Sequence, residues 1–417
     1  MLKKTAADFG AMRHFVRKAP IAHLAGPSLR VARRVPPRQS GIRMHVAALC
    51  RPAAASLVVG WSAFAGCAFA QSSSEHTNHE QPGKELVLFL RGEAHHLSSS
   101  TSPNSPSEDS WFSADIVLAL TRDRFRVFGE YLVEQQEHDL ERLQLGYEVV
   151  PNTVAWIGRF HQPASAWNTE HHHGRYLQTS ITRPSVELWE DEDGIIPQHI
   201  AGVLVDSRQT LGDHGGLEVS AGAGLGPRIE EKKLEPLDLV DPHEAGRHIS
   251  WLARVAYQPD FFGASAFGVV AARHRIPVMD GSIVNFPLTT EVRQDIYGAF
   301  AYWSQEPWRV VATVYDVHLG LLSPAGTRGE RFLTGYVEAD RELPHSLVAF
   351  GRVEDTSRAS RSAYLTGNHP DFEVRRLILG LRWDLRPRQA LTVEAGRGET
   401  SRGHQNEIRL QWSAALP

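Results

Sequence analysis

The sequence predicts an all-β fold: a transmembrane, antiparallel, up-and-down β-barrel of about 16 strands, preceded by a cleavable signal segment. Three observations support this prediction. An apolar segment near the N-terminus ends in a secretory cleavage pattern, the remaining chain alternates apolar and polar residues over long segments, and every second connection between those segments is short. The chain therefore divides into an N-terminal extension with a signal peptide at 1–70, a periplasmic leader at 71–84 and a barrel at 85–417.

The apolar stretch 53–70 has the features of a secretory signal. It ends in Ala68-Phe69-Ala70, a small-x-small pattern, so we expect cleavage after Ala70. The basic segment 1–43 shows no clear periodicity and resembles an upstream extension of the reading frame, with Met44 as the start. An uncleaved membrane anchor is the alternative, because the stretch is almost long enough to span a bilayer.

Charge and cysteine content exclude several classes of protein. Residues 1–70 hold 11 of the 44 lysines and arginines and a single acidic residue, so the remainder, with 33 basic and 47 acidic residues, has a formal charge of −14. An acidic exported chain lacks the basic surface that nucleic-acid binding requires. Cys50 and Cys67 both lie in the segment expected to be removed, so the mature chain has no thiol for a disulfide, a zinc-thiolate site or a nucleophile. We expect no cofactor.

Alternation with a period of two residues dominates the chain from Glu85 onward. In the last segment, Ile408, Leu410 and Trp412 point to one face and the polar residues between them point to the other. Segments of about ten to fourteen residues are longer than the strands of an average soluble sheet. We expect strands near 85–96, 110–121, 124–135, 140–149, 153–162, 198–208, 214–225, 247–257, 262–274, 290–303, 307–320, 330–340, 345–355, 372–384, 389–398 and 406–413.

The connections between these segments differ in length in a regular way. The short ones are 122–123, 150–152, 209–213, 258–261, 304–306, 341–344 and 385–388, whereas the others reach 35 residues at 163–197 and 21 residues at 226–246. An even strand number, with short turns on one rim and mostly longer loops on the other, is typical of bacterial outer-membrane barrels.

The apolar faces of the predicted strands require a closed sheet in lipid. In water they would form a belt larger than soluble monomers tolerate, and lipid accepts that belt only if no strand edge is left unpaired. Aromatic residues near the strand ends suit the two membrane interfaces: Trp111, Trp156, Tyr257, Trp303, Trp308, Trp383 and Trp412. We therefore expect the barrel in the bacterial outer membrane, in contact with lipid and lipopolysaccharide.

In these features, and in a third long loop that is the longest, the chain resembles the Gram-negative porins. The final strand, from Glu407 to Trp412, is similar to the family's C-terminal assembly signal of alternating apolar residues ending in an aromatic residue, although Ser413 to Pro417 follow it. The resemblance covers 85–417 and has no diagnostic short motif. It implies a passive channel for small hydrophilic solutes or ions, commonly assembled as a homotrimer.

In porins the third loop folds into the barrel and narrows the pore, with acidic residues facing basic residues on the wall. Loop 163–197 of this chain offers Glu187, Glu190, Asp191, Glu192 and Asp193, and the polar faces of the strands offer Arg126, Arg142, Arg159, Arg254, Arg376, Arg382 and Arg409. Such rows across a water-filled constriction would order dipolar solutes and filter them by size and charge. The alternative is a solvated extracellular cap over a wet lumen.

The third loop also carries His171, His172 and His173, with His161 just before it and His199 just after it. Imidazoles and carboxylates in one segment could hold zinc, copper or nickel, so a metal-binding or metal-uptake barrel is an alternative function. Three consecutive histidines cannot all point at one ion without help from elsewhere. A polar or aromatic-packed loop therefore competes with the metal interpretation.

Two other classes of barrel are less well supported by the residues. A serine hydrolase needs a nucleophile, a base and an orienting group, and the chain has no G-x-S-x-G sequence, so we expect no enzyme activity. A structural or adhesive barrel with a plugged lumen would carry bulky inward residues. Gly146, Gly380, Gly396 and Gly398 on the predicted lumen face favour open space instead.

Overall fold

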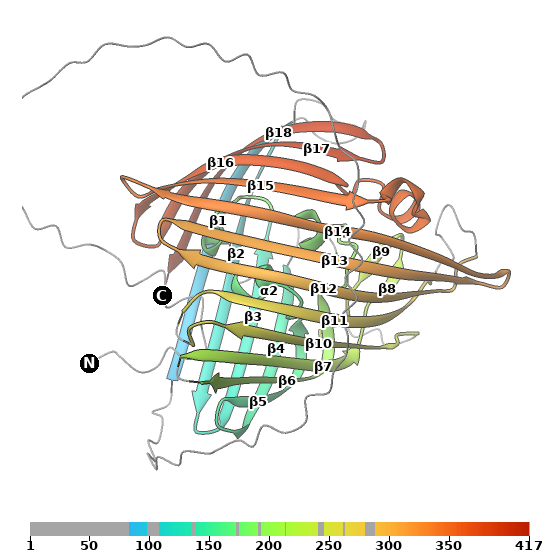
Figure 1. Cartoon of the computed structure of the whole chain (residues 1–417), viewed down its shortest axis with the longest axis horizontal. Helices are drawn as coiled ribbons and strands as arrows, with labels where there is room; N and C mark the ends of the chain where they lie inside the picture. The colour runs from blue at the N-terminus through green and yellow to red at the C-terminus, as the bar shows by residue number, and fades with distance from the viewer. Residues whose placement is uncertain are drawn as a thin grey trace, which may run out of the picture. The chain divides into compact units, whose positions relative to one another are not determined.

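The computed structural model describes residues 83–97, 108–135, 138–171, 175–190, 193–212, 214–240, 246–261, 263–279 and 288–416. Within these residues the chain forms a closed barrel of 16 antiparallel strands, which confirms the expected architecture (Figure 1). Neighbouring strands in the barrel follow one another along the chain, and a separate two-stranded ribbon is inserted between β7 and β10. The proposed signal segment and most of the leader lie outside the described residues.

All 16 predicted strands are present in this barrel, with ends that shift by a few residues. They are β1 (Gly83–Leu97), β2 (Glu108–Arg122), β3 (Phe125–Glu134), β4 (His138–Val150), β5 (Thr153–His161), β6 (His199–Leu211), β7 (Gly215–Leu225), β10 (Ile249–Gln258), β11 (Ala266–Pro277), β12 (Glu291–Gln305), β13 (Trp308–Ser323), β14 (Gly326–Leu343), β15 (Leu347–Ser357), β16 (Arg375–Arg386), β17 (Gln389–Thr400) and β18 (Gly403–Leu416). The inserted ribbon consists of β8 (Arg228–Glu230) and β9 (Lys233–Glu235).

The barrel closes by pairing β1 with β18. Their register runs from Leu88 opposite Leu416 to Leu97 opposite Glu407. Residues 413–416, which follow Trp412, are therefore part of the last strand and contribute to closure.

One rim of the barrel carries only short turns, as predicted. Asp123 and Asn152 in two of these turns have φ angles of 54° and 60°, a left-handed conformation that Asp and Asn adopt at low cost in hairpins. The other rim is less regular than expected, because β13 and β14 continue into a two-residue turn at 324–325. Figure 1 shows this hairpin extending past its neighbours.

The outer surface of the barrel is apolar along most strands. On β18, for example, Ile408 is 58% exposed and Leu410 47%, whereas Glu407 and Gln411 are buried on the lumen side. The same alternation repeats on β10 and β16. A closed sheet that exposes such a belt is stable in hydrocarbon, so the barrel spans a membrane. Among the described residues, no helix is long and apolar enough to cross a membrane.

Two aromatic residues expected at the membrane interfaces lie on the lumen side instead. Trp111 pairs across strands with the buried Glu93, and its ring lies 5.2 Å from that of His95. Trp156 packs against the buried apolar clusters of the lumen. In both cases the neighbour in sequence, Phe112 or Ile157, is the exposed outer residue. The sequence is apolar on both faces at these positions, so alternation could not assign the side.

The lumen wall has an apolar half and a polar half. The apolar half is formed by inward side chains of β10–β14, including Leu252, Ile276, Val292, Ile296, Phe300, Val311, Tyr315, Val317, Leu319, Leu321 and Phe332. The polar half, on β15–β18 and β1–β4, carries Arg91, Glu93, Arg126, Glu130, Arg142, Arg352, Glu354, Arg376, Arg382, Glu394 and Glu407.

The lumen-side glycines do not mark open space. A Cβ atom at Gly146 would lie 2.5 Å from the Trp156 ring, and one at Gly380 would lie 2.1 Å from the Phe350 ring. Cβ atoms at Gly396 and Gly398 would meet the side chains of neighbouring glutamates. Gly146 and Gly380 therefore accommodate an aromatic ring on an adjacent strand, and Gly396 and Gly398 accommodate a glutamate side chain, which is a packing role.

Candidate functional site

The third loop, residues 162–198 between β5 and β6, lies inside the barrel. Its helix α2 (Ala166–Glu170) begins at Ser165, whose side chain accepts a hydrogen bond from the Asn168 amide at 3.1 Å. Trp167 is fully buried, and its ring centroid lies 6.2 Å from that of Tyr336 on β14. Figure 1 shows α2 within the ring of strands.

Two 3-10 turns carry the loop across the lumen. In η1 (Arg175–Leu177), Tyr176 joins a buried cluster with Phe89 of β1 and Ala415 of β18. After η2 (Ser185–Glu187), Ile195 and Ile196 join the large cluster of the apolar half. The loop therefore contacts both halves of the lumen wall.

Two wall arginines bind the backbone of this loop. Arg382 on β16 donates hydrogen bonds to the carbonyl oxygens of Tyr176 and Gln178 at 2.7 and 2.5 Å. Arg352 on β15 donates to the carbonyls of Thr182 and Arg183 at 2.9 and 3.0 Å. Because a non-helical backbone inside a barrel must find partners for its carbonyl groups, these guanidinium groups make the inward fold of the loop possible.

Wall carboxylates satisfy the amide groups of the same segment. Glu394 on β17 accepts from the Ile181 amide at 2.7 Å, and Glu354 on β15 accepts from the Ser185 amide at 2.6 Å. Arg352 also contacts Glu354 and Glu338 at 2.8 and 2.9 Å. Sequence reasoning did not select these residues, although alternation places them on the polar faces of predicted strands.

The predicted site arginines are all on the lumen wall, and they have different partners. Arg382 contacts the third loop, as described above. The other six lie next to acidic residues: Arg126 with Glu148 at 2.9 Å, Arg142 with Glu130 at 2.7 Å, Arg159 with Asp139 at 3.1 Å, Arg254 with Glu218 at 3.1 Å, Arg376 with Glu373, just before β16, at 2.8 Å and Arg409 with Glu93 at 2.8 Å.

Two of the predicted loop acids are deeply buried. The Tyr315 hydroxyl donates a hydrogen bond to Glu187 at 3.2 Å, and burial raises the pKa of Glu187 to about 7. Glu190 accepts from the backbone amide of His199 at 2.9 Å and lies 2.8 Å from its Nδ1 atom. Burial alone would raise the pKa of Glu190, but the charge of His199 and these hydrogen bonds hold it below its usual value.

The remaining predicted loop acids contribute less to the described site. Burial raises the pKa of Asp193, which follows η2 and has a positive φ of 66°. Asp191 and Glu192 lie outside the described residues.

A charged strip runs along the polar half of the lumen. It consists of Arg91, Glu93, Glu130, Glu134, Arg142, Glu407 and Arg409 on β1, β3, β4 and β18. Within it, Arg91 contacts Glu134 at 2.6 Å, and Arg409 contacts both Glu93 and Glu407 at 2.8 Å. These groups place charges of both signs next to one another on the lumen wall.

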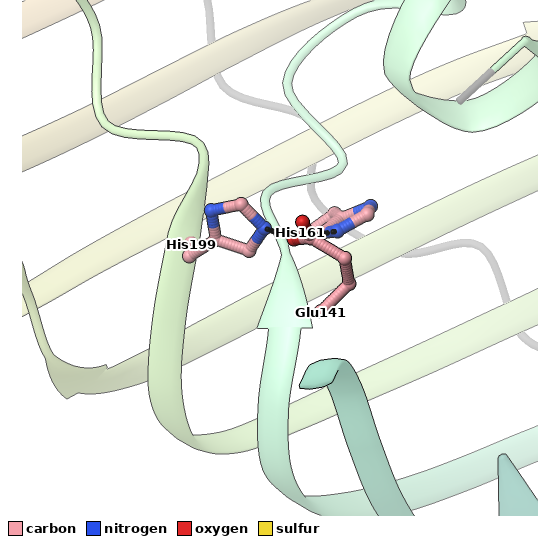
Figure 2. A group of neighbouring side chains, drawn as sticks. All are labelled: Glu141, His161 and His199. Atoms are coloured by element: carbon pink, nitrogen blue, oxygen red, sulfur yellow. Dashed lines mark ion pairs between the residues drawn. The ribbon is translucent and has the colours of Figure 1, made fainter. Parts of the chain in front are cut away.

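A cluster of histidine and carboxylate side chains stands where the third loop leaves and rejoins the wall. The Nε2 atom of His199 lies 3.0 Å from Oε2 of Glu141, and the Nε2 atom of His161 lies 4.0 Å from the same oxygen. Figure 2 shows the Glu141 carboxyl group between the two imidazole rings. Trp189 of the loop packs on both rings, at centroid distances of 4.6 and 5.1 Å.

The predicted metal ligands in the loop are placed only in part. His171 is buried between aromatic rings, 5.2 Å from Trp167 and 6.0 Å from Tyr302. Burial holds the pKa of His171 well below its ordinary value, so this imidazole is neutral. His172 and His173 lie outside the described residues.

Comparison with known proteins identifies the fold. No protein-family model matches the chain, and no curated protein matches it. Solved structures do: the anion-selective porin from Comamonas acidovorans covers 81% of this chain and 100% of its own length, with a TM-score of 0.55 and 11% identity. The fold is that of the Gram-negative outer-membrane porins.

Two further solved structures agree with this porin fold. OmpF of Salmonella typhi covers 80% of the chain and 97% of its own length, with a TM-score of 0.52 and 13% identity. The outer-membrane channel DcaP of Acinetobacter baumannii covers 82% and 100%, with a TM-score of 0.51 and 11% identity. The closed barrel with an even strand number, the apolar outer belt and the short turns on one rim are those of a barrel of the bacterial outer membrane.

Proposed function

We propose that the protein is a passive channel for small hydrophilic solutes or ions, in which the third loop forms the constriction. The observation that carries the proposal is the insertion of this loop into the lumen, where Arg352 and Arg382 hold its backbone. Apolar side chains of β10–β14 pack against the loop on one side of the lumen. Solutes would then pass beside the charged strip.

The charged strip supports passage of polar solutes for a physical reason. It presents three arginines and four glutamates on β1, β3, β4 and β18. A hydrated solute that loses part of its water shell there finds hydrogen-bond donors and acceptors to replace it. The predicted site residues Arg126, Arg159, Arg254 and Arg376 extend the same chemistry along the wall, and Asp191 and Glu192 belong to the proposed constriction loop.

Single-channel recording in a planar bilayer tests this function directly. Purified protein is expected to produce discrete current steps, and removal of 166–196 is expected to enlarge them while the barrel stays folded. A bilayer that remains silent with folded wild-type protein would reject the channel. Release of fatty acid from phospholipid vesicles, assayed in parallel, would reveal a lipase instead, which we do not expect.

Assembly as a homotrimer is a second part of the proposal. One structural neighbour, OmpT of Vibrio cholerae in a trimer form, covers 100% of its own length with a TM-score of 0.52 and 11% identity. The apolar outer belt can contact either lipid or another barrel, and lipopolysaccharide is the expected lipid partner. Analytical ultracentrifugation in detergent, corrected for bound detergent, distinguishes a trimer from a monomer.

A further inference from the structure

We propose that Glu141, His161 and His199 form a binding site for a divalent transition-metal ion, with Zn²⁺ as the best match. The site is distinct from the run of histidines at 171–173, and it does not depend on whether the lumen conducts. Its three side chains come from the ends of β4, β5 and β6, which the barrel brings together (Figure 2).

The positions of the donor atoms suit one small ion. Each residue offers one ligand atom, and these atoms all lie within 4.8 Å of one another. A tetrahedral Zn²⁺ with bonds of about 2.0–2.1 Å holds its ligand atoms about 3.3 Å apart. The separations of 3.0 and 4.0 Å from Oε2 of Glu141 lie on either side of that value, so small side-chain rotations would complete the geometry.

The chemistry of the set selects the class of ion. Two imidazole nitrogens and one carboxylate oxygen are ligands of zinc and of neighbouring transition metals, whereas Ca²⁺ and Mg²⁺ prefer oxygen alone. Three protein ligands leave a fourth position for water or for a group on a passing solute. The inferred ion is therefore Zn²⁺ or a similar borderline cation.

A second carboxylate orients one of the ligands. Oε2 of Glu190 lies 2.8 Å from Nδ1 of His199, so the Nε2 atom of that ring is directed to Glu141. Glu190 is itself fixed by the amides of Gln198 and His199, at 2.5 and 2.9 Å. A histidine held between a metal and a carboxylate is a common arrangement in zinc sites, where the carboxylate fixes the ring.

Other charged groups around the cluster compete with a metal ion for its ligands. Arg159 lies 3.7 Å from Oε2 of Glu141 but is closer to Asp139, at 3.1 Å. Without an ion, a doubly protonated His199 can donate from Nε2 to Glu141 and from Nδ1 to Glu190. Binding of a metal replaces that proton at Nε2, and the two carboxylates offset the added positive charge.

The consequence of binding follows from the position of the ligands. His161 is the last residue of β5 and His199 the first residue of β6, so an ion between them joins the two stems of the third loop. Metal occupancy would therefore fix the base of the proposed constriction.

Metal titration of the full-length protein tests the site. Untagged protein is folded in detergent, stripped with a chelator and titrated with Co²⁺ as a visible probe, followed by displacement with Zn²⁺. We expect one equivalent with the visible absorption of a low-coordinate cobalt site. His161→Gln and His199→Gln should each weaken binding at least tenfold, and Glu190→Gln should weaken it about tenfold through ring orientation.

Matched variants separate this site from other histidines. His138→Gln changes an exposed histidine on β4 and should leave the bound equivalent of metal intact. Combined alanine substitution at 171–173 should also leave it intact. Folding of every variant is checked by gel electrophoresis, in which the unheated, folded barrel is compared with the heated, unfolded chain. Absence of a bound equivalent in wild type, its persistence at full affinity in His199→Gln, or its loss only in the 171–173 variant would overturn the proposal.

Fluorescence of Trp189 supplies a second readout. Because its ring lies 4.6 and 5.1 Å from the two imidazoles, bound Cu²⁺ should quench its emission. Trp189→Phe should remove the quenched component while the cobalt equivalent remains. Equal quenching in wild type and Trp189→Phe would contradict the assignment of the site.

Discussion

Arg352 on β15 donates a hydrogen bond to the carbonyl oxygen of Thr182, 170 positions away in the chain, at 2.9 Å. The arginine side chain is fully buried, and it contacts Glu338 and Glu354 as well. The same guanidinium therefore neutralises two wall carboxylates and holds the third loop in the lumen. This relationship connects the stability of the barrel to the width of the proposed pore.

We predict that Arg352→Met loosens the third loop. Loss of the guanidinium leaves two buried glutamates without their cation and several loop carbonyls without a donor, which should cost about 3–5 kcal/mol. Unfolding by urea in detergent micelles measures the loss, and single-channel conductance should rise. Arg375→Met, an exposed arginine on β16, is the control and should change stability by about 1 kcal/mol or less. Equal effects of the two substitutions would contradict the role of Arg352.

We predict that Glu187 makes barrel stability depend on pH. Burial raises its folded pKa from 4.5 to about 7, so the proton is held more tightly in the folded state. The stabilisation is fully present below pH 4.5 and is lost as pH rises through about 7, an effect of up to about 3 kcal/mol. Glu187→Gln should flatten this part of the profile.

The neighbours of Glu187 do not reverse this sign. Ser165 and Tyr315 donate hydrogen bonds to it and Arg183 attracts its charge, which all lower its pKa, yet burial outweighs them. Unfolding free energies at several pH values between 4 and 8 give the profile. Glu342→Gln, at an exposed position on β14, should keep the wild-type dependence, and a wild-type profile without any fall in this range would contradict the prediction.

We predict that Arg409→Gln shifts the proposed channel toward cations. Arg409 contacts Glu93 and Glu407 in the charged strip, so its removal takes one positive charge from the strip while both carboxylates remain. Reversal potentials under a salt gradient measure the change. Arg397→Gln, an exposed arginine on β17, should leave the reversal potential where it is. An unchanged potential in Arg409→Gln would place the conducting path elsewhere in the lumen.

We predict that Gly380→Ala destabilises the barrel. The added Cβ would lie 2.1 Å from the Phe350 ring and 2.6 Å from the Val393 carbonyl oxygen, so the wall must shift. This strain should lower the free energy of unfolding by about 1–3 kcal/mol. Gly329→Ala on β14 is the matched control, since no atom lies within 4 Å of its Cβ position. Thermal unfolding followed by circular dichroism should show a lower midpoint for Gly380→Ala alone.

Strand positions were predictable because each strand carries its own signal. Alternation fixes which side chains meet lipid, and this signal is local to about ten residues. It failed at Trp111 and Trp156, where both faces of the strand are apolar and a local pattern has no preferred side. The same limit applied to Gly146 and Gly380, because a lumen glycine next to an aromatic ring has no distinguishing sequence context.

The candidate site was predictable only as a set of residue types. Alternation placed Arg352 and Glu394 on the lumen face, but their partners in the third loop are 170 and 213 positions away. Charge content of the loop suggested acids facing arginines, whereas Glu187 and Glu190 lie against Tyr315 and His199. The outcome depends on how deeply the loop is inserted, which no pattern within the loop encodes.

The sequence by itself determined the barrel, its strand number and its outer belt, because backbone pairing and side-chain period act between neighbouring segments. Only the tertiary structure decided what fills the lumen and which groups meet there. Pairing of β4 with β5 and of β5 with β6 places His161 opposite His199 and brings Glu141 beside them, although the long third loop separates the two histidines in the sequence.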